Sequence, residues 1–310
     1  MPAVVHANLD AEAAWARTRL PAAVERRISL VGTLAAYLAP PGDVELWTPA
    51  AVDPARILFA GAPALNLRTG VPPRADLTWA APAAAAANDR RWALALAREH
   101  GLALPGARAI AALDELAALP GPWVAKVPWT AAGRDRARGA GVPEGELRAR
   151  MARLLARTGE LVVEPWCERI TDAGQCATVD AAGTVDARPP HGLLVDARGG
   201  FAGIDLDLAR AALLPTELAE LARTVAVVGA ALARLGYAGP FGVDAFAYRA
   251  ADETRRFHPL VEVNARYTFG WVAHALAARR DARRLGFGPA PPGATTLIAP
   301  AGDNVTAWCA

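Results

Sequence analysis

The segment G-P-F-G-V-D-A-F-A-Y-R-A-A-D-E-T-R-R-F-H-P-L-V-E-V-N-A-R, residues 239–266, is the most informative part of this 310-residue chain. Its apolar runs, 241–248 and 260–264, flank a polar connection and predict two antiparallel strands joined as a hairpin. When the hairpin is centred on the polar connection, Asp244 and Glu262 face each other. Because side chains alternate along a strand, Asn264 lies on the same face as Glu262.

These facing acids predict a metal site. Directly opposed carboxylates repel each other in a sheet, and a divalent cation reverses the sign of that interaction. Two carboxylates and an amide carbonyl are hard oxygen ligands that suit Mg²⁺ held jointly with substrate phosphates, so we expect the ligands to be Asp244, Glu262 and Asn264. The alternative is a solvated polar face on which Arg266 neutralises the acids.

Lysine occurs once in the chain, at Lys126, whereas every other basic side chain except histidine is arginine. An arginine serves wherever only charge and solubility are needed, so this position has a specific requirement. Lysine offers a compact ammonium on a flexible stem, and a crowded phosphate site favours that shape over a planar guanidinium. The sequence therefore marks Lys126 as a candidate phosphate ligand.

Composition excludes several classes of protein. The formal charge of +2 gives no basic field for a nucleic acid or an anionic membrane, so neither is an expected partner. The three cysteines form no Cys-x-x-Cys pair, and the N-terminal residues show no export signal, so the expected location is the cytoplasm. No apolar run reaches the length of a membrane span. The oligomeric state stays open between a monomer and a homodimer.

The order of elements predicts an α/β protein. Residues 1–88 form a small α/β unit, and the alanine-rich run at 80–87 connects it to a helix capped by Asn88 and Asp89. Further along the chain, apolar patterns predict strands at 123–127 and 161–164, three short strands within 175–201, and a long amphipathic helix at 215–235.

Over residues 89–280 the chain resembles the ATP-grasp superfamily of ATP-dependent ligases. G-P-F-G-V-D-A-F and L-V-E-V-N-A-R are similar to that family's paired magnesium strands, and P-W-V-A-K-V-P is similar to its lysine-bearing strand. The resemblance implies an α/β (α+β) fold in which two lobes grip ATP, preceded by an N-terminal domain. Residues 1–88 would be that domain, and 89–310 the ATP-grasp domain, with a smaller lid lobe at about 105–165 and a C-terminal lobe at about 166–310.

The resemblance also assigns roles. Lys126 and Arg266 would be catalytic, and Asp244, Glu262 and Asn264 would hold one or two Mg²⁺ ions, with Mn²⁺ as an alternative. The run L-V-V-E-P-W-C-E resembles the hinge that holds adenine. ATP would contact the following residues: Arg90, Lys126, Gly133, Glu164, Trp166, Cys167 and Asp172. Glu168 is the alternative to Asp172 as the residue that binds ribose.

Two features depart from the family pattern. Arg90 stands where the family usually has a second lysine, and the flexible lid after Lys126 has few glycines. Gly133, Gly139 and Gly141 are the candidates for an anion-binding nest in that lid.

The implied reaction joins a carboxylate and an amine, both small molecules, through an acyl phosphate, with release of ADP and phosphate. Phosphoryl transfer needs positioning and charge stabilisation rather than a protein nucleophile. The alternatives are an ATP-grasp kinase and an inactive nucleotide-binding module. Acceptor contacts are expected within 188–205, where Arg188 and His191 are candidates. We also expect Lys126→Ala to abolish ATP turnover and leave the fold intact, as for an exposed side chain in a cleft.

Overall fold

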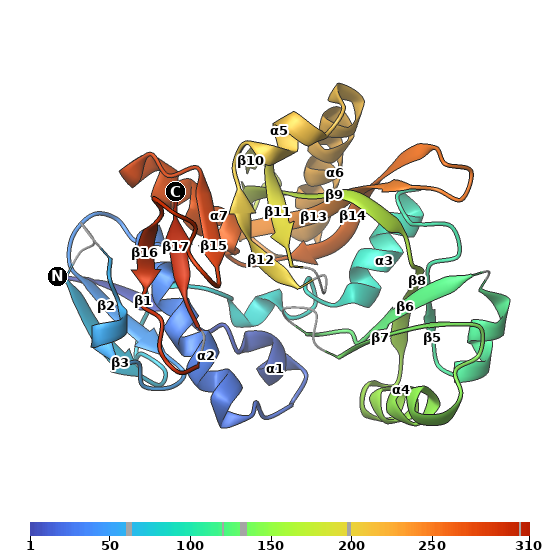
Figure 1. The fold of residues 1–310 in the computed structure, drawn as a ribbon, viewed down its shortest axis with the longest axis horizontal. Coiled ribbons are helices and arrows are strands. Elements are labelled where there is room, and N and C mark those ends of the chain that lie inside the picture. Colours follow the sequence, from blue (N-terminus) through green and yellow to red (C-terminus); the bar gives the residue numbers. More distant parts are fainter. Residues whose placement is uncertain (60–63, 120, 131–134, 197–199, 304) are drawn as a thin grey trace.

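The computed structural model describes residues 1–59, 64–119, 121–130, 135–196, 200–303 and 305–310. Three sheets follow one another along the chain, and Figure 1 shows the smaller lid lobe set apart from the rest of the molecule.

The first sheet is parallel and belongs to the N-terminal unit. Its strand order is β3-β2-β1-β4, with bounds Leu65–Thr69, Val44–Thr48, Ala3–His6 and Leu77–Thr78. Two helices, α1 (Ala11–Trp15) and α2 (Ala22–Gly32), follow the first strand. Pro21 precedes the second helix, because its ring removes a backbone donor that a helix interior needs.

The lid lobe is a four-stranded antiparallel sheet with its own core. Its order is β5-β8-β6-β7, with bounds Arg108–Ile110, Leu161–Pro165, Pro122–Lys126 and Arg136–Ala140. Helix α4 (Gly145–Thr158) and a 3-10 helix, Leu113–Ala118, pack against this sheet around Trp123 and Met151, which are fully buried. Helix α3 (Arg90–Glu99) precedes the lobe and begins at the cap residue Asp89, as predicted.

The lid contains a strand that the sequence analysis treated as a loop. Gly139 lies in β7 opposite Trp123, and a Cβ atom at this position would lie 2.6 Å from Trp123 Cζ2. Gly141 has a positive φ of 62°, and its carbonyl accepts a hydrogen bond of 2.9 Å from Trp123 Nε1. Packing against Trp123 therefore explains Gly139 better than the predicted anion nest. Gly133 lies outside the described residues.

The third sheet has nine strands and contains the hairpin with Asp244 and Glu262. Its order is β14-β13-β9-β11-β12-β15-β17-β16, and β10 pairs with β9. In chain order the bounds are β9 Glu168–Val179, β10 Val185–Ala187, β11 His191–Val195, β12 Phe201–Asp205, β13 Gly239–Arg249, β14 Arg255–Asn264, β15 Arg284–Phe287, β16 Thr295–Ile298 and β17 Ala307–Cys309. Three helices accompany this sheet: α5 (Leu208–Ala212), α6 (Pro215–Arg234) and α7 (Phe269–Arg280).

Helix α6 agrees with the periodicity of its sequence, because Leu221, Val225, Val228 and Leu232 are all buried against the sheet. It spans 20 residues, yet neither it nor any other helix in the described part of the chain is both long and apolar enough to cross a membrane. Of the three short strands expected within 175–201, two are β10 and β11, and the first is wrong, since it is part of the long strand β9, which already begins at Glu168.

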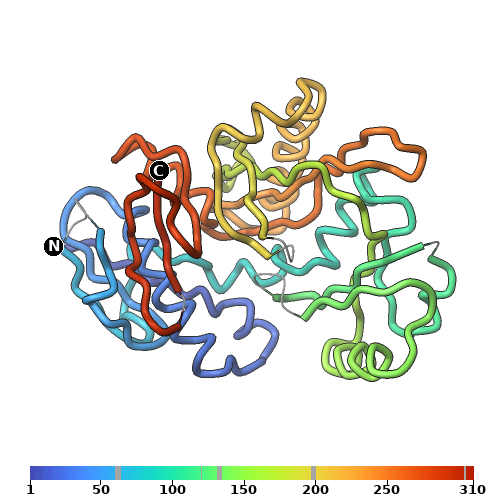
Figure 2. Tube along the Cα trace, viewed as in Figure 1, coloured from blue at the N-terminus to red at the C-terminus, as the bar shows by residue number. Residues whose placement is uncertain are grey.

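The N-terminal unit and the C-terminal strands share one hydrophobic core. Val5, Leu34 and Leu46 pack in the same cluster as Leu285 and Leu297. Figure 2 shows the two ends of the chain side by side, and an isolated bridge joins residues 57 and 298. The division of the chain at residue 88 therefore stays a prediction, because this core continues across it.

Candidate functional site

The single lysine forms a buried ion pair. Lys126 ends β6, and its Nζ lies 2.5 Å from Oε2 of Glu164 on the neighbouring strand β8. The two side chains are only 14% and 11% exposed. Burial alone would raise the pKa of Glu164, but the charge and hydrogen bond of Lys126 lower it below its usual value. The premise that Lys126 is an exposed cleft residue was therefore wrong.

Arg90 joins the lid to the carboxylate hairpin. Its Nη1 donates to the carbonyl of Val127 at 3.1 Å, and its Nη2 donates to the carbonyl of Thr130 at 3.0 Å and to Oε1 of Glu262 at 2.7 Å. The side chain is 8% exposed. The partner of Glu262 is Arg90, whereas the charge of Arg266 acts on Asp244 and opposes the rise of its pKa, so the alternative considered from the sequence is corrected for Glu262 only. Nη2 uses both of its N–H groups, whereas Nη1 uses one and Nε has no acceptor among the described residues, so Arg90 keeps a donor for phosphate on Nη1.

The two acids of the hairpin face each other as the sequence predicts. Asp244 on β13 is in register with Glu262 on β14, and the register shifts directly beyond this pair, before Phe246. Asn264 Nδ2 donates to Asp244 Oδ2 at 3.3 Å. Burial, together with the charge of Glu262, raises the pKa of Asp244 to about 7. Arg90 neutralises Glu262, but the raised pKa shows that the negative charge of Asp244 is not fully compensated.

The donor set fits a divalent cation. Asp244 and Glu262 supply carboxylate oxygens and Asn264 an amide oxygen, which is the ligand chemistry of Mg²⁺. In the structure the amide nitrogen of Asn264 faces Asp244 and its oxygen accepts from Arg266, so the amide has to turn before its oxygen can join the two acids. Within the described ranges, no group of three or more His, Cys, Asp and Glu side chains could hold a metal ion. The site thus has two acids of its own, and a cation there needs further oxygens such as those of a phosphate.

A glycine lies beside Asp244 on the neighbouring strand. Gly174 on β9 lies in register with Asp244 on one side and with His191 on the other. A Cβ atom at Gly174 would lie 3.0 Å from His191 Nε2 and 3.4 Å from Asp244 Oδ1. Because Gly174 has no side chain, the imidazole of His191 and the carboxylate of Asp244 can both lie close to its backbone. Burial, reinforced by the nearby His274, lowers the pKa of His191 to about 3, so this imidazole is neutral.

Arg266 is held from two sides. Its Nη2 donates to Asn264 Oδ1 at 2.8 Å, and its Nε donates to Glu12 Oε1 at 2.6 Å. Nothing in the sequence around Glu12 indicated this contact, because the two residues are 254 positions apart. The arginine expected to contact the acceptor, Arg188, lies over the ring of Trp271 at 5.4 Å from the ring centroid.

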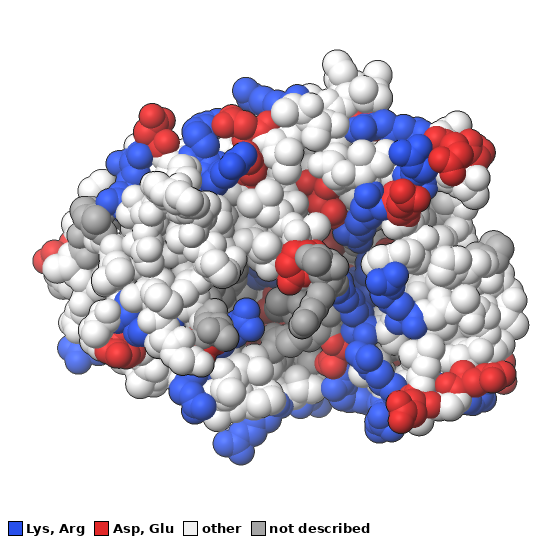
Figure 3. All heavy atoms as spheres, viewed as in Figure 1, with Lys and Arg blue, Asp and Glu red and all other residues white. Residues whose placement is uncertain are grey.

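The hinge segment presents aromatic and basic groups together. The Arg138 guanidinium stacks on Trp166, 3.4 Å from the ring centroid, and links strand β7 to the hinge. Cys167 is half-buried, and burial raises the pKa of its thiol. On the face shown in Figure 3, basic side chains line the border between the lid lobe and the rest of the molecule.

The two acids considered as the ribose-binding residue differ in burial. Asp172 is buried and pairs with Arg169, whose guanidinium lies 4.2 Å from the centroid of the Phe246 ring. Asp172 and Phe246 are neighbours in register on β9 and β13. Glu168 is exposed and lies 3.8 Å from Arg249. Each acid thus lies against an arginine, and Asp172 as the ribose-binding residue stays a prediction.

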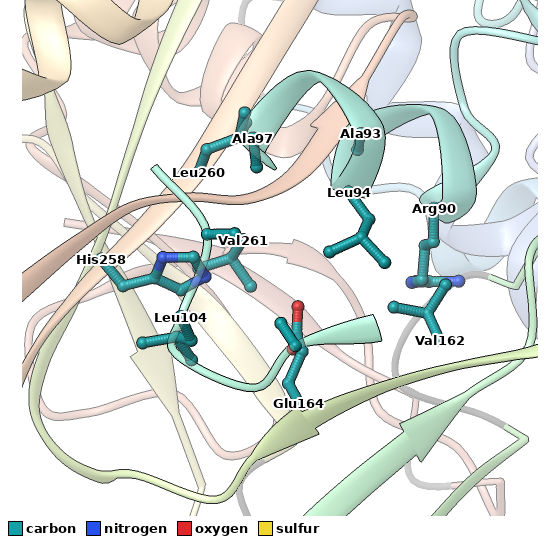
Figure 4. Close-up of a pocket in the computed structure, with 12 residues that line it drawn as sticks. Arg90, Ala93, Leu94, Ala97, Leu104, Val162, Glu164, His258, Leu260 and Val261 are labelled. Carbon is teal, nitrogen blue, oxygen red and sulfur yellow. The ribbon is translucent and has the colours of Figure 1, made fainter. Parts of the chain in front are cut away.

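A small cavity lies behind the lysine pair. Its volume of about 10 Å³ has room for one water molecule and none for a nucleotide. Figure 4 shows Glu164 pointing into it between Leu94 and Leu104, with His258 on the far side. Burial lowers the pKa of His258 to about 4, so the cavity is lined by an acid, a guanidinium from Arg90 and a neutral imidazole. This cavity is therefore not a place where a nucleotide could bind.

Comparison with known proteins identifies the architecture. No protein-family model and no curated protein sequence matches the chain. Biotin carboxylase from Campylobacter jejuni, solved as a complex described as beta-gamma-ATP, is 11% identical with a TM-score of 0.58, over 99% of this chain and 86% of the other. N5-carboxyaminoimidazole ribonucleotide synthetase from Thermus thermophilus is 15% identical with a TM-score of 0.54, over 100% of this chain and 93% of the other.

A third structure contains both a nucleotide and a metal. The biotin carboxylase domain of 2-oxoglutarate carboxylase from Hydrogenobacter thermophilus, solved with MgADP, ADP and bicarbonate, is 12% identical with a TM-score of 0.57, over 99% of this chain and 85% of the other. At such identities these likenesses show a shared fold, and the chemistry of this chain has to be argued from its own residues.

Proposed function

We propose that this chain, which has the ATP-grasp fold, is an ATP-dependent ligase that joins a carboxylate to an amine and releases ADP and phosphate. One observation carries the proposal: Asp244 and Glu262 face each other on paired strands, with the pKa of Asp244 raised to about 7. Such an arrangement costs stability unless a cation occupies it. Together with the fold, it supports a site for a magnesium-bound nucleotide.

The residues divide the work as follows. Asp244, Glu262 and Asn264 would hold one or two Mg²⁺ ions, with Mn²⁺ as the alternative. The metal would supply positive charge to the phosphate oxygens during transfer. Lys126 and Arg266 would bind the phosphoryl oxygens as charge develops on them.

Lys126 has donors left for a nucleotide. In the structure its ammonium lies against Glu164, on the hinge side of the lid, and this contact uses one of its three N–H groups. We propose that the adenine amino group donates to Glu164 and that phosphate oxygens accept from Lys126, which makes two charge-assisted contacts. Asp172 would accept a hydrogen bond from a ribose hydroxyl, beside its pair with Arg169.

The chemistry proceeds in two balanced steps. A carboxylate oxygen of the substrate attacks the γ-phosphorus, the bond to the ADP oxygen breaks, and an acyl phosphate forms. The amine nitrogen then attacks the acyl carbon, phosphate leaves with the bonding electron pair, and the nitrogen loses a proton. No side chain has to form a covalent bond, which agrees with a site built of charged and hydrogen-bonding groups.

The test needs no knowledge of the substrate. Thermal unfolding is measured with ADP, with and without Mg²⁺, because a ligand at 100 times its Kd adds about 2.7 kcal/mol of stability. We expect a magnesium-dependent rise for the wild-type chain and none for Glu262→Gln. The matched control is Asp252→Asn, at the exposed end of the same hairpin. Absence of any rise at millimolar MgADP would refute the nucleotide site.

A second measurement separates a ligase from a kinase. Pools of carboxylates are incubated with MgATP and hydroxylamine, which converts an acyl phosphate to a hydroxamate. Hydroxamate formed together with ADP supports the ligase, whereas a stable phosphorylated product without hydroxamate supports the kinase. Lys126→Met should form neither product.

A further inference from the structure

A carboxylate of the N-terminal unit reaches the candidate site. Glu12 lies in α1 and is only 6% exposed, although glutamate is rarely buried without a partner. Its partner is Arg266, on the segment that follows β14, with Oε1 2.6 Å from Nε. The Arg266 side chain is itself 14% exposed. The contact is therefore a largely buried ion pair between the two ends of the chain.

The geometry of Arg266 leaves part of its fork available. Nε donates to Glu12, Nη2 to Asn264 Oδ1 at 2.8 Å, and Nη1 to the carbonyl of Tyr267 at 3.1 Å. A guanidinium carries five N–H donors, so among the described residues one N–H on each terminal nitrogen remains without one of these acceptors. A pair of donors on neighbouring nitrogens matches the geometry of a phosphoryl or carboxylate group.

The attachment of the N-terminal unit is firm enough to fix this group. The backbone N–H of Tyr267 donates to the carbonyl of Trp79 at 3.0 Å, directly after Arg266. Asn8 exchanges two side-chain hydrogen bonds with the backbone of Ala80, at 2.8 and 3.1 Å. The N-terminal unit that carries Glu12 is thus joined to the chain directly after Arg266.

We propose that Glu12 is a positioning residue, which holds Arg266 through Nε so that its two remaining donors meet the phosphoryl group during transfer. This inference rests on the proposed function, since it assigns Arg266 to that group. Without Glu12 the guanidinium keeps its hydrogen bonds to Asn264 and to the Tyr267 carbonyl, but both of these acceptors are neutral, so Glu12 is the one carboxylate among these three acceptors. A contact that only fastened the N-terminal unit would affect stability and leave the recognition of the phosphoryl group unchanged.

The test compares two ligands in the full chain. The Kd of MgADP is measured by calorimetry with and without aluminium fluoride, which mimics the phosphoryl group during transfer. For Glu12→Gln we expect a Kd for MgADP within about twofold of wild type, and a loss of about tenfold or more in the tightening that aluminium fluoride gives. Arg266→Gln should lose the same amount, the double variant no more, and Glu12→Asp should recover part of it.

The control is a second buried Glu–Arg pair outside the candidate site. Glu217 and Arg255 lie 2.7 Å apart, with side chains 7% and 29% exposed. Glu217→Gln should lose stability and keep the full tightening. If Glu12→Gln does not fold, the double variant with Arg266→Gln removes both charges and is compared with Arg266→Gln alone.

Several results would overturn the proposal. If aluminium fluoride lowers the Kd of MgADP as much in Glu12→Gln as in wild type, the pair is only a structural contact. The same holds if the double variant loses more of this effect than Arg266→Gln alone. Wild-type chain that binds MgADP but shows no tightening would remove the phosphoryl role of Arg266. Wild-type chain that does not bind MgADP would refute the proposed function, and this inference with it.

Discussion

Replacing Lys126 by methionine should destabilise the protein, because the change leaves the Glu164 carboxylate buried without its partner. Methionine keeps most of the apolar stem, so the variant removes mainly the charge. Breaking one side of a buried ion pair costs about 3 to 5 kcal/mol. Since the Lys126 and Glu164 side chains keep 14% and 11% of their surface, we expect the lower end, about 3 kcal/mol.

The assay is urea unfolding followed by tryptophan fluorescence. Trp123 lies in the core of the same lobe, and because the chain has nine tryptophans the signal reports on unfolding of the whole chain, this lobe included. The double variant Lys126→Met with Glu164→Leu should recover most of the stability, because an apolar pair has no charge to desolvate. Arg148→Met is the control, since its partner Asp114 is exposed and the pair should contribute less than about 1 kcal/mol.

The pH dependence provides an independent check. Lys126 lowers the pKa of Glu164, so the pair stabilises the wild-type fold above the usual glutamate range, and that contribution is lost as the pH falls through it. The deficit of Lys126→Met should therefore shrink in acid, where Glu164 becomes protonated. A loss below about 0.5 kcal/mol at neutral pH would refute the reasoning.

Three further predictions follow from the same structure. The pKa of Asp244 is raised to about 7, so without metal its ionisation destabilises the fold as the pH rises from about 4 to 7; urea unfolding should show a larger gain for Asp244→Asn at pH 8 than at pH 5, and an equal gain would contradict this. Gly174→Ala should weaken the magnesium-dependent thermal shift, because the new methyl lies 3.0 Å from His191 Nε2 and 3.4 Å from Asp244 Oδ1; an unchanged shift would exclude crowding there. Gly139→Ala should lower the free energy of unfolding by about 1 to 3 kcal/mol, since its Cβ would lie 2.6 Å from Trp123, whereas wild-type stability would show that the indole can move aside.

The sequence predicted what depends on local pattern. Helix α6 and the hairpin of β13 and β14 appear where the periodicity predicts them. Each element buries one apolar face, and the spacing of apolar residues along the sequence is the signal of such a face. The pairing of Asp244 with Glu262 could be predicted because a short connection fixes the register of a hairpin.

Contacts between distant segments could not be predicted in this way. Glu12 has no local signal, since its burial depends on Arg266 far along the chain. The ion pair of Lys126 with Glu164 required the order of strands in the lid sheet, in which β8 lies beside β6. Strand β7 was missed because a run of arginine, alanine and glycine has low strand propensity, and only its pairing with β6 stabilises it.

The shared core of the N-terminal unit and the C-terminal strands has a consequence for biosynthesis. Residues such as Val5 and Leu34 leave the ribosome early, but their partners Leu285 and Leu297 follow more than two hundred positions later. At typical translation rates this interval is on the order of tens of seconds. The lid lobe carries its own core between Ile110 and Val163, so it can fold during that interval. We therefore expect the lid lobe to complete its core before the shared core is complete, although the first sheet is synthesised before the lid.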